Sequence, residues 1–190
     1  MSLSVGAAES VAPDRRLAVV TSALTTFARF GYRKTSMEQV AKAAQISRPG
    51  LYFLFASKEE LFRAAVTHTL EQDLARVANI LTAEEGTLAT ELLEAFDTWA
   101  GRYIGPIARD ITTVIEENPE ILGDVAITAP RRFADLLVAS LAERAEGSGR
   151  QNAVAVAQTL ISASIGLKHQ VDDRAVYLER MKTAIDLVLA

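Results

Sequence analysis

The residues with the most chemistry to offer lie between positions 47 and 58, in the stretch SRPGLYFLFASK. The guanidinium of Arg48 can donate hydrogen bonds to a guanine edge or to a phosphate, and Tyr52 offers a hydroxyl to a phosphate. Pro49 presents a compact apolar surface that suits a thymine methyl group, and Gly50 lets the backbone approach phosphates and base edges. Together these residue types are typical of a surface that reads duplex DNA.

Three further residues could hold phosphate groups at helix N-termini, where free N–H groups and the helix dipole favour an anion. They are Thr35, Ser36 and Lys58. Phe53 admits two interpretations, which are an apolar contact at the edge of a DNA groove and packing within the fold. A single tyrosine, lysine or arginine is as often a core or solvated surface residue, but their joint occurrence around one turn favours DNA.

Charge is divided unevenly along the chain of 190 residues. Residues 13–63 hold nine Lys or Arg against four Asp or Glu, which gives a net charge of +5. The whole chain carries −4, so the remainder carries −9. A basic head on an acidic body indicates that the head meets an anion such as a nucleic-acid backbone. A chance distribution over a solvated surface is the alternative.

Apolar residues recur at helical spacing and alternating strand patterns are nearly absent, so the sequence predicts an all-α fold. A first helix is expected to begin at Asp14, which caps it, and to end at Gly31. Two overlapping capping boxes in Thr35–Gln39, which pair the first residue with the fourth and the second with the fifth, predict a short second helix.

Pro49 marks the beginning of a third helix rather than forbidding one. Ser47 caps this helix, and Pro49 falls in its first turn, where the missing N–H is not needed. Leu51 and Phe55 are expected on the buried side. The second and third helices are joined by a tight turn at residues 44–46, and together they form a helix-turn-helix.

Three segments are expected along the chain. Residues 1–12 form a disordered tail, residues 13–56 a helix-turn-helix DNA-binding domain, and residues 57–190 a helical body. The capping box SKEE at residues 57–60 opens a helix to about Leu81 that should run without a break from head to body. Breaks at Gly, Pro and Asp residues then delimit about five more helices.

The segment from Thr35 to Leu61, TSMEQVAKAAQISRPGLYFLFASKEEL, resembles the DNA-binding signature of the TetR family of bacterial transcriptional regulators. The matching positions are Thr35, Val40-Ala41, Ser47, Leu51-Tyr52, Phe55, Ser57-Lys58-Glu59 and Leu61. The detailed match covers about a quarter to a third of the chain, and the remainder is similar only in its length and all-helical character.

Two positions depart from that signature. Family members often carry Gly where Pro49 stands, and His or Tyr where Leu54 stands. That His or Tyr usually touches a phosphate, which Leu54 cannot do. One contact to the DNA backbone is therefore expected to be missing.

The resemblance implies a homodimer through the last two helices, a near-palindromic double-stranded DNA operator and a small-molecule effector. Residues 57–190 would then form a ligand-binding and dimerisation domain. The sequence allows this, because residues 151–168 are apolar around much of a helix and such a helix is buried on more than one side. A helix at the centre of a monomer core is the alternative.

Phe96, Trp99 and Tyr103 step by three and four positions, so they are expected on one face of a helix. There they could line an apolar cavity that also offers a hydroxyl and an indole N–H to a ligand. A plain core stripe is the alternative interpretation.

Other classes of function find little support in the sequence. The absence of cysteine excludes disulfides, thiolate metal sites and cysteine nucleophiles. His68 and His169 are isolated, and no Gly-rich phosphate loop follows a strand, so no enzyme activity, metal or cofactor is expected. No apolar run approaches the roughly 20 residues of a membrane span, and the N-terminus lacks the pattern of a signal peptide, so a cytoplasmic protein with no membrane partner is expected.

The sequence therefore predicts a DNA-binding transcriptional regulator, a repressor that a small molecule releases from its operator. The alternative is a helical small-molecule binding or interaction protein that does not read specific DNA.

Overall fold

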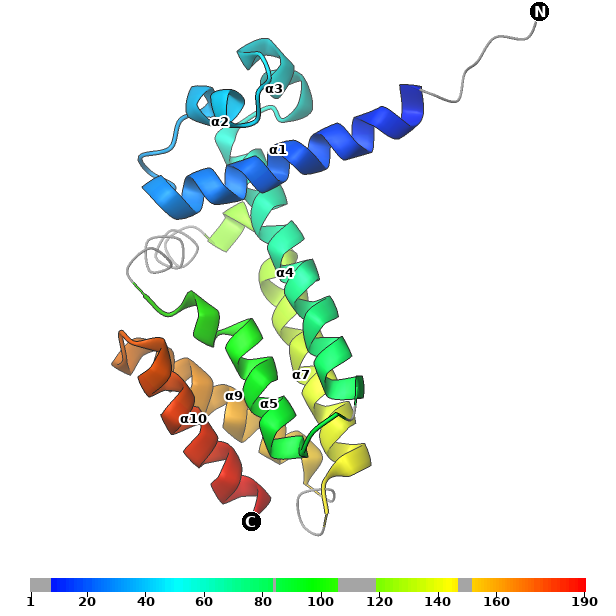
Figure 1. Cartoon of the computed structure of the whole chain (residues 1–190), viewed down its shortest axis with the longest axis vertical. Coiled ribbons are helices and arrows are strands. Elements are labelled where there is room, and N and C mark those ends of the chain that lie inside the picture. The colour runs from blue at the N-terminus through cyan, green and yellow to red at the C-terminus, as the bar shows by residue number, and fades with distance from the viewer. Residues whose placement is uncertain (1–7, 84, 106–118, 147–151) are drawn as a thin grey trace, which may run out of the picture. The chain divides into compact units, whose positions relative to one another are not determined.

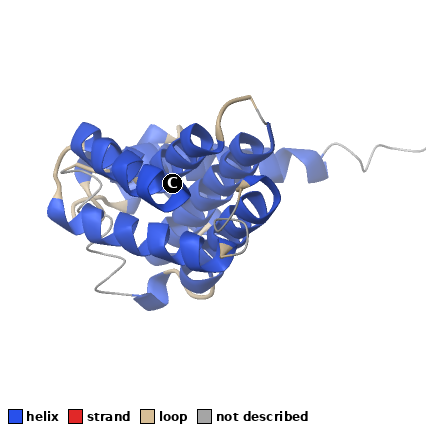
Figure 2. Ribbon diagram, turned by 90° about the horizontal axis from the view of Figure 1, so that it is seen from below, coloured by secondary structure: helices blue, strands red, loops and turns tan. Residues whose placement is uncertain are grey.

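The computed structural model describes residues 8–83, 85–105, 119–146 and 152–190. Within these ranges the secondary structure consists of α-helices and two short 3₁₀ helices, and the same ranges contain no strand (Figure 2). The predicted all-α fold is thereby confirmed. The predicted Gly-rich break at residues 147–149 lies outside the described residues.

The chain forms two compact units. The first contains the described residues up to Thr69 and those from 119 to Gly123, and the second contains the rest. The division falls within α4 (Lys58–Ala83), not between residues 56 and 57 as the sequence suggested. The reason is that Leu61, Phe62 and Ala65 are fully buried, so the first turns of α4 belong to the core of the first unit.

The first unit begins with α1 (Ala8–Phe30), α2 (Met37–Ala43) and α3 (Arg48–Leu54), which Figure 1 labels. Helix α2 packs against both α1 and α3. Aromatic rings hold α1 to α4, because the ring of Phe62 lies edge-on to Phe27 at 5.2 Å and 4.6 Å from the ring of Tyr32, measured between centroids.

The beginning of α1 differs from the prediction. The helix starts at Ala8, so residues 8–12 are not a tail and Asp14 lies inside the helix and does not cap it. Residues 1–7 lie outside the described residues. Asp14 had suggested a start because aspartate is a common N-cap, but the helix continues through Pro13, which lacks only one backbone N–H donor.

The other helix ends of this unit follow their predicted local signals. Gly31 ends α1 with a φ of 79°, and its N–H donates to the carbonyl of Phe27 at 2.8 Å. Ser36 caps α2 in a capping box with Gln39, so the second of the two overlapping boxes is the one that forms. Ser57 accepts a hydrogen bond from the N–H of Glu60 at 3.1 Å at the start of α4.

The second unit is a helical bundle. Its described elements are the remainder of α4, α5 (Leu88–Trp99), the 3₁₀ helix η1 (Gly101–Tyr103), α7 (Val125–Arg144), α9 (Ala153–Gln170) and α10 (Arg174–Leu189). The 3₁₀ helix η2 (Pro119–Ile121) belongs to the first unit. Helix α10 packs against α5 and α9, and α7 packs against α9 and α5.

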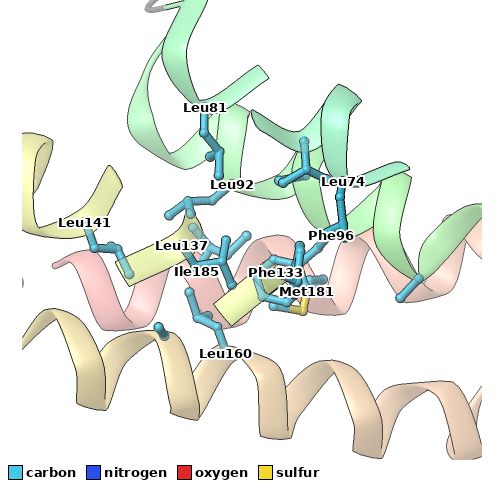
Figure 3. Close-up of a cluster of buried hydrophobic side chains, with 14 of the residues drawn as sticks. Leu74, Leu81, Leu92, Phe96, Phe133, Leu137, Leu141, Leu160, Met181 and Ile185 are labelled. Carbon is cyan, nitrogen blue, oxygen red and sulfur yellow. The ribbon is translucent and has the colours of Figure 1, made fainter. Parts of the chain in front are cut away.

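A single apolar core fills this bundle (Figure 3). It includes Leu92 and Phe96 from α5, Leu137 from α7, Leu160 from α9 and Met181 from α10. Each of these five side chains is 0% exposed, so the α-helices α5, α7, α9 and α10 each contribute a fully buried residue.

One largely buried ion pair joins the ends of three helices in the second unit. Arg144 of α7 donates to the carboxylate of Glu91 in α5 and to the carbonyls of Leu81 and Gly86. Its hydrogen bond is the main reason why the pKa of the Glu91 carboxyl lies below its ordinary value. Arg144 thus joins the end of α4, the start of α5 and the end of α7.

Substitution of Gly31 should test the C-terminal stop of α1. Gly31→Ala places a Cβ in the left-handed backbone region, so we expect the free energy of unfolding to fall by about 1 kcal/mol. Gly31→Asn should lower the free energy of unfolding by about half as much, because asparagine tolerates this backbone conformation better than alanine. Urea unfolding followed by circular dichroism measures both, and equal stabilities for glycine, alanine and asparagine would contradict the assignment.

Candidate nucleic-acid interface

Helix α3 turns one side to the core of the first unit and the other to solvent. Leu51 and Phe55, the residue that follows the helix, are both 0% exposed, as predicted. Successive residues of an α-helix are about 100° apart, so residues two positions away lie on nearly opposite sides. Pro49 and Phe53 therefore face away from Leu51, and both are exposed.

The start of α3 is built by local hydrogen bonding. Ser47 is the N-cap, and its hydroxyl oxygen accepts a hydrogen bond from the N–H of Gly50 at 3.1 Å. A Cβ at Gly50 would lie 3.1 Å from the same oxygen, so glycine suits this cap. Gln45, in the turn between α2 and α3, takes a φ of 55° and lets the chain reverse within a few residues.

A second exposed ridge of α3 carries polar groups. The guanidinium carbon of Arg48 lies 5.7 Å from the centre of the Tyr52 ring, one helical turn away. A guanidinium that stacks on a ring keeps the N–H donors at its edge available. The predicted residues that gather on this surface are Ser47, Arg48, Pro49, Gly50, Tyr52 and Phe53.

Thr35 does not belong to this surface. Its side chain is 2% exposed, and its hydroxyl donates to the carbonyl of Gly31 at 2.7 Å. The side chain therefore closes the connection between α1 and α2 and is not presented to a phosphate, which corrects the prediction. Ser36 is exposed, but its N–H donates to the side chain of Gln39 at 2.7 Å and its hydroxyl accepts from the Gln39 N–H.

Lys58 has internal partners that the sequence did not reveal. Its ammonium group donates to the carbonyls of Tyr32 at 3.1 Å and Thr35 at 3.3 Å. The same nitrogen lies 4.3 Å from the centre of the Tyr32 ring. A half-buried cation in this position holds the connection between α1 and α2 against the start of α4.

Tyr32 completes this arrangement. Its ring is 8% exposed, and its hydroxyl donates to the carboxylate of Glu59 at 3.2 Å. Burial, together with the negative charge of Glu59, raises the pKa of Tyr32 to about 12, so the hydroxyl keeps its proton at neutral pH.

Arg16 of α1 is a residue that sequence reasoning missed. Its guanidinium lies 4.0 Å from the centre of the Phe55 ring and donates to the carbonyl of Leu54 and to Glu60. Arg16 thus fixes the C-terminal end of α3. Its partners lie 38 and 44 positions along the chain, and no local pattern in the sequence signals a contact over that distance.

The three candidate ligand-binding residues of the second unit do not share one helical face. Helix α5 ends at Trp99, and Tyr103 lies in η1, because the helix gives way to a tighter turn at Ala100 and Gly101. Phe96 is 0% exposed and packs edge-on against Phe133. Trp99 is half-buried and stacks on the same Phe133 ring at 4.7 Å.

The hydroxyl of Tyr103 is hydrogen-bonded to a buried carboxylate. Its hydroxyl donates to Asp73 of α4, and Arg102 donates to the other oxygen of that carboxylate at 2.9 Å. Burial raises the pKa of the Asp73 carboxyl, and the two donors oppose that rise. This arrangement joins η1 to α4.

A groove of about 390 Å³ lies between α4 and α7 in the second unit. It is lined by Glu71, Leu74, Ala75, Ala78, Arg132, Asp135 and Leu136. None of the three predicted ligand-binding side chains lines it. Glu71 and Arg132 face each other across it in an ion pair at 2.5 Å.

Two further properties concern only the residues that the structure describes. Within the described ranges, no helix is both long enough and apolar enough to cross a membrane. No group of three or more His, Cys, Asp or Glu side chains in these ranges is placed to hold a metal ion.

The contacts of Lys58 generate a stability prediction. Lys58→Met keeps the length of the side chain but removes two hydrogen bonds from a charged donor, so the free energy of unfolding should fall by about 1–2 kcal/mol. Lys42→Met is the matched control, because Lys42 is exposed on α2, and its loss should change stability by less than about 0.5 kcal/mol. Urea unfolding measures both.

The salt dependence of DNA binding can distinguish the structural role of Lys58 from the phosphate contact that the sequence predicted. If Lys58→Met leaves stability unchanged and reduces the slope of log affinity against log salt by about one ion, Lys58 contacts phosphate. A loss of stability with no change in that slope supports the structural role.

Part of the first unit matches the model of a known protein family. The model of the bacterial regulatory proteins of the tetR family matches residues 19–65, which include α2, α3 and the start of α4. The HTH-type transcriptional regulator RutR of Escherichia coli is 37% identical over 57 residues, which are 30% of this chain and 27% of RutR. The matches span between 24% and 58% of the length of such curated relatives.

Solved structures extend the likeness to the rest of the chain. A transcriptional regulator from Rhodococcus sp. gives a TM-score of 0.72 at 18% identity, over 92% of this chain and 95% of its own. FadR of Bacillus subtilis, solved in complex with stearoyl-CoA, gives 0.55 at 16% identity, over 92% and 97%. At these identities the likeness establishes the fold alone. Residues 19–65 thus match the model of the bacterial regulatory proteins of the tetR family, and the fold of the chain is similar to that of solved transcriptional regulators.

Proposed function

We propose that the chain is a sequence-specific DNA-binding transcriptional regulator. It would act as a repressor that leaves its operator when the second unit binds a small molecule. The observation that carries the proposal is the solvent-facing surface of α3, where Arg48, Tyr52 and Phe53 are exposed while Leu51 holds the helix in place. A short helix that shows its first turns to solvent has the dimensions needed to enter a major groove.

Electrostatics supports the choice of DNA as the partner. Residues 13–63 carry a net charge of +5 in a chain whose total is −4. Arg48 and Lys42 are exposed on α3 and α2. Positive charge near a groove-reading helix attracts the phosphate backbone and positions the helix, whereas contacts to base edges give the sequence preference.

The roles on α3 divide by chemistry. Arg48 is assigned to a guanine edge, where a guanidinium donates to two acceptors at once. The Tyr52 hydroxyl and Ser36 are assigned to phosphates. Ser47 and Gly50 form the cap that sets where α3 begins, so they act by bringing its first turn close to the DNA.

A homodimer through α9 and α10 forms part of the proposal. These helices expose four apolar side chains, namely Val154, Ile165, Val176 and Leu187, the last with 74% exposed. Tyr177 and Met181, by contrast, are fully buried in their own unit and are not available to a partner. A two-fold dimer would read two half-sites of a near-palindromic operator.

A small-molecule effector is proposed for the second unit. FadR, which shares the fold, was solved with stearoyl-CoA. In this chain Phe96 lies in the core, so Trp99 and Tyr103 are the predicted side chains that retain partial exposure. As the single tryptophan of the sequence, Trp99 would report binding by its fluorescence.

The role of Arg48 can be tested once a preferred sequence is known. The full chain is first used to select duplexes from a random pool. Arg48→Ala should then lose preference at one position in each half-site, with a cost of about 1–3 kcal/mol there. The matched control is Lys42→Ala, which should weaken binding to selected and random duplexes alike. Gel retardation at fixed salt measures each affinity.

Two outcomes would count against this part of the proposal. Equal losses on selected and random duplexes would make Arg48 a phosphate contact. A pool from which wild-type chain enriches no sequence, with binding only at low salt, would favour a binding protein that does not read specific DNA.

The dimer generates a second prediction. Ile165→Asp or Leu187→Asp places a charge on the apolar surface of α9 or α10, so the mass in sedimentation at micromolar concentration should fall to that of a monomer. Ile127→Asp is the control, because Ile127 is 56% exposed on α7. Dissociation by the control alone would place the interface elsewhere.

A further inference from the structure

The outermost ridge of α3 is apolar. Phe53 is 90% exposed, the highest value among the large hydrophobic side chains exposed in the described residues. Pro49, one turn earlier, is exposed as well. Both lie two positions from the fully buried Leu51, so they share the side of the helix that points most directly away from the core.

A single exposed apolar residue needs no explanation in general, because much of any protein surface is apolar. Three observations set Phe53 apart. Pro49, the other residue of the ridge, is apolar too, the ridge lies on a helix within the residues that the family model matches, and the polar ridge of Arg48 and Tyr52 lies beside it. The ridge is therefore central to the surface that meets DNA, not peripheral to it.

We propose that the ridge of Pro49 and Phe53 reads thymine through its 5-methyl group, so that each operator half-site contains a thymine whose methyl contacts Phe53. This inference rests on the proposed function. A phenyl ring has no hydrogen-bonding group, so the only base-edge feature of the major groove that it can favour is the apolar methyl of thymine. Cytosine carries only a hydrogen at the corresponding C5 position, and a phenyl ring would leave its neighbouring amino group without a partner.

The charge around the ridge favours duplex DNA over a protein as its occupant. Arg48 lies beside it on α3, and Lys42 is exposed on the preceding helix. An apolar contact beside a cation suits a groove in which methyl groups lie between two phosphate backbones. A second copy of this chain would bring the same positive surface against itself, which like charges oppose.

Deoxyuridine gives a test that removes the methyl group and changes nothing else at the base edge. The preferred duplex is selected from a random pool with the full wild-type chain, and each thymine is then replaced singly by deoxyuridine. At one thymine in each half-site we expect wild-type affinity to fall about three- to fivefold, the effect of one methyl group leaving an apolar contact. Phe53→Ala should bind the thymine duplex more weakly and show no further loss with deoxyuridine.

The matched control is Phe30→Ala, which removes a phenylalanine that is 43% exposed on α1. It should keep both the affinity and the penalty for deoxyuridine. Phe53→Leu provides a second variant that retains an apolar side chain, and it should keep part of the penalty. Circular dichroism confirms that each variant is folded.

Each other outcome overturns the inference. A clear selected sequence whose deoxyuridine penalty is absent, or persists unchanged in Phe53→Ala, leaves the proposed function intact and removes the thymine contact. Self-association that Phe53→Ala abolishes, with DNA binding unaffected, would make the ridge a contact between copies. A pool that enriches no sequence would overturn the proposed function, and this inference with it.

Discussion

The surface that α3 presents depends on the burial of Leu51 and Phe55. A helix of seven residues has little stability of its own, because forming the first turn costs more than its few hydrogen bonds return. Burying a Leu or Phe side chain stabilises by about 1.5–3 kcal/mol, which is enough to fix the rotation of so short an element. The directions of Arg48 and Phe53 are thus set by packing on the opposite side.

Several cations of the first unit make contacts within the fold, in addition to any contact that they make with a binding partner. Arg16 covers the Phe55 ring, Lys58 binds two carbonyls, and Arg63 donates to the carbonyl of Ile121. These side chains keep their charge, but their donor groups are already engaged, so a count of basic residues overstates how many of them can donate directly to a phosphate. The charge at the surface of α3 comes from fewer residues, and Arg48 is the one on the helix itself.

Local signals in the sequence predicted local structure well. The glycine stop at Gly31, the caps at Ser36 and Ser47 and the burial of Leu51 all depend on residues within one or two turns, so a short stretch of sequence contains the whole interaction. The same stretch predicted which residues of α3 reach the surface.

Interactions between distant residues could not be predicted in this way. The partners of Lys58 lie 23 and 26 positions away, and those of Arg16 still further, so the sequence predicted a phosphate contact for Lys58 and no particular role for Arg16. In the sequence, Thr35 and Ser36 were equally good candidates for the N-cap of α2, and the structure shows that Ser36 is the N-cap. Tyr103 left the expected helical face because a turn at Gly101 changed the helical period, which spacing alone does not reveal.

The alternation of buried and exposed sides along α3 has a consequence for how its sequence can vary. Pro49 departs from the glycine that the family often has, yet it is exposed and falls in the first turn, where its missing N–H is not needed. Leu54 departs from the family's His or Tyr, but its carbonyl still accepts from Arg16, a contact that any residue could make. Positions whose side chains face solvent can therefore change the chemistry offered to DNA while Leu51 and Phe55 keep the helix in place. Stability and sequence preference are separable on this helix because residues two positions apart lie on nearly opposite sides.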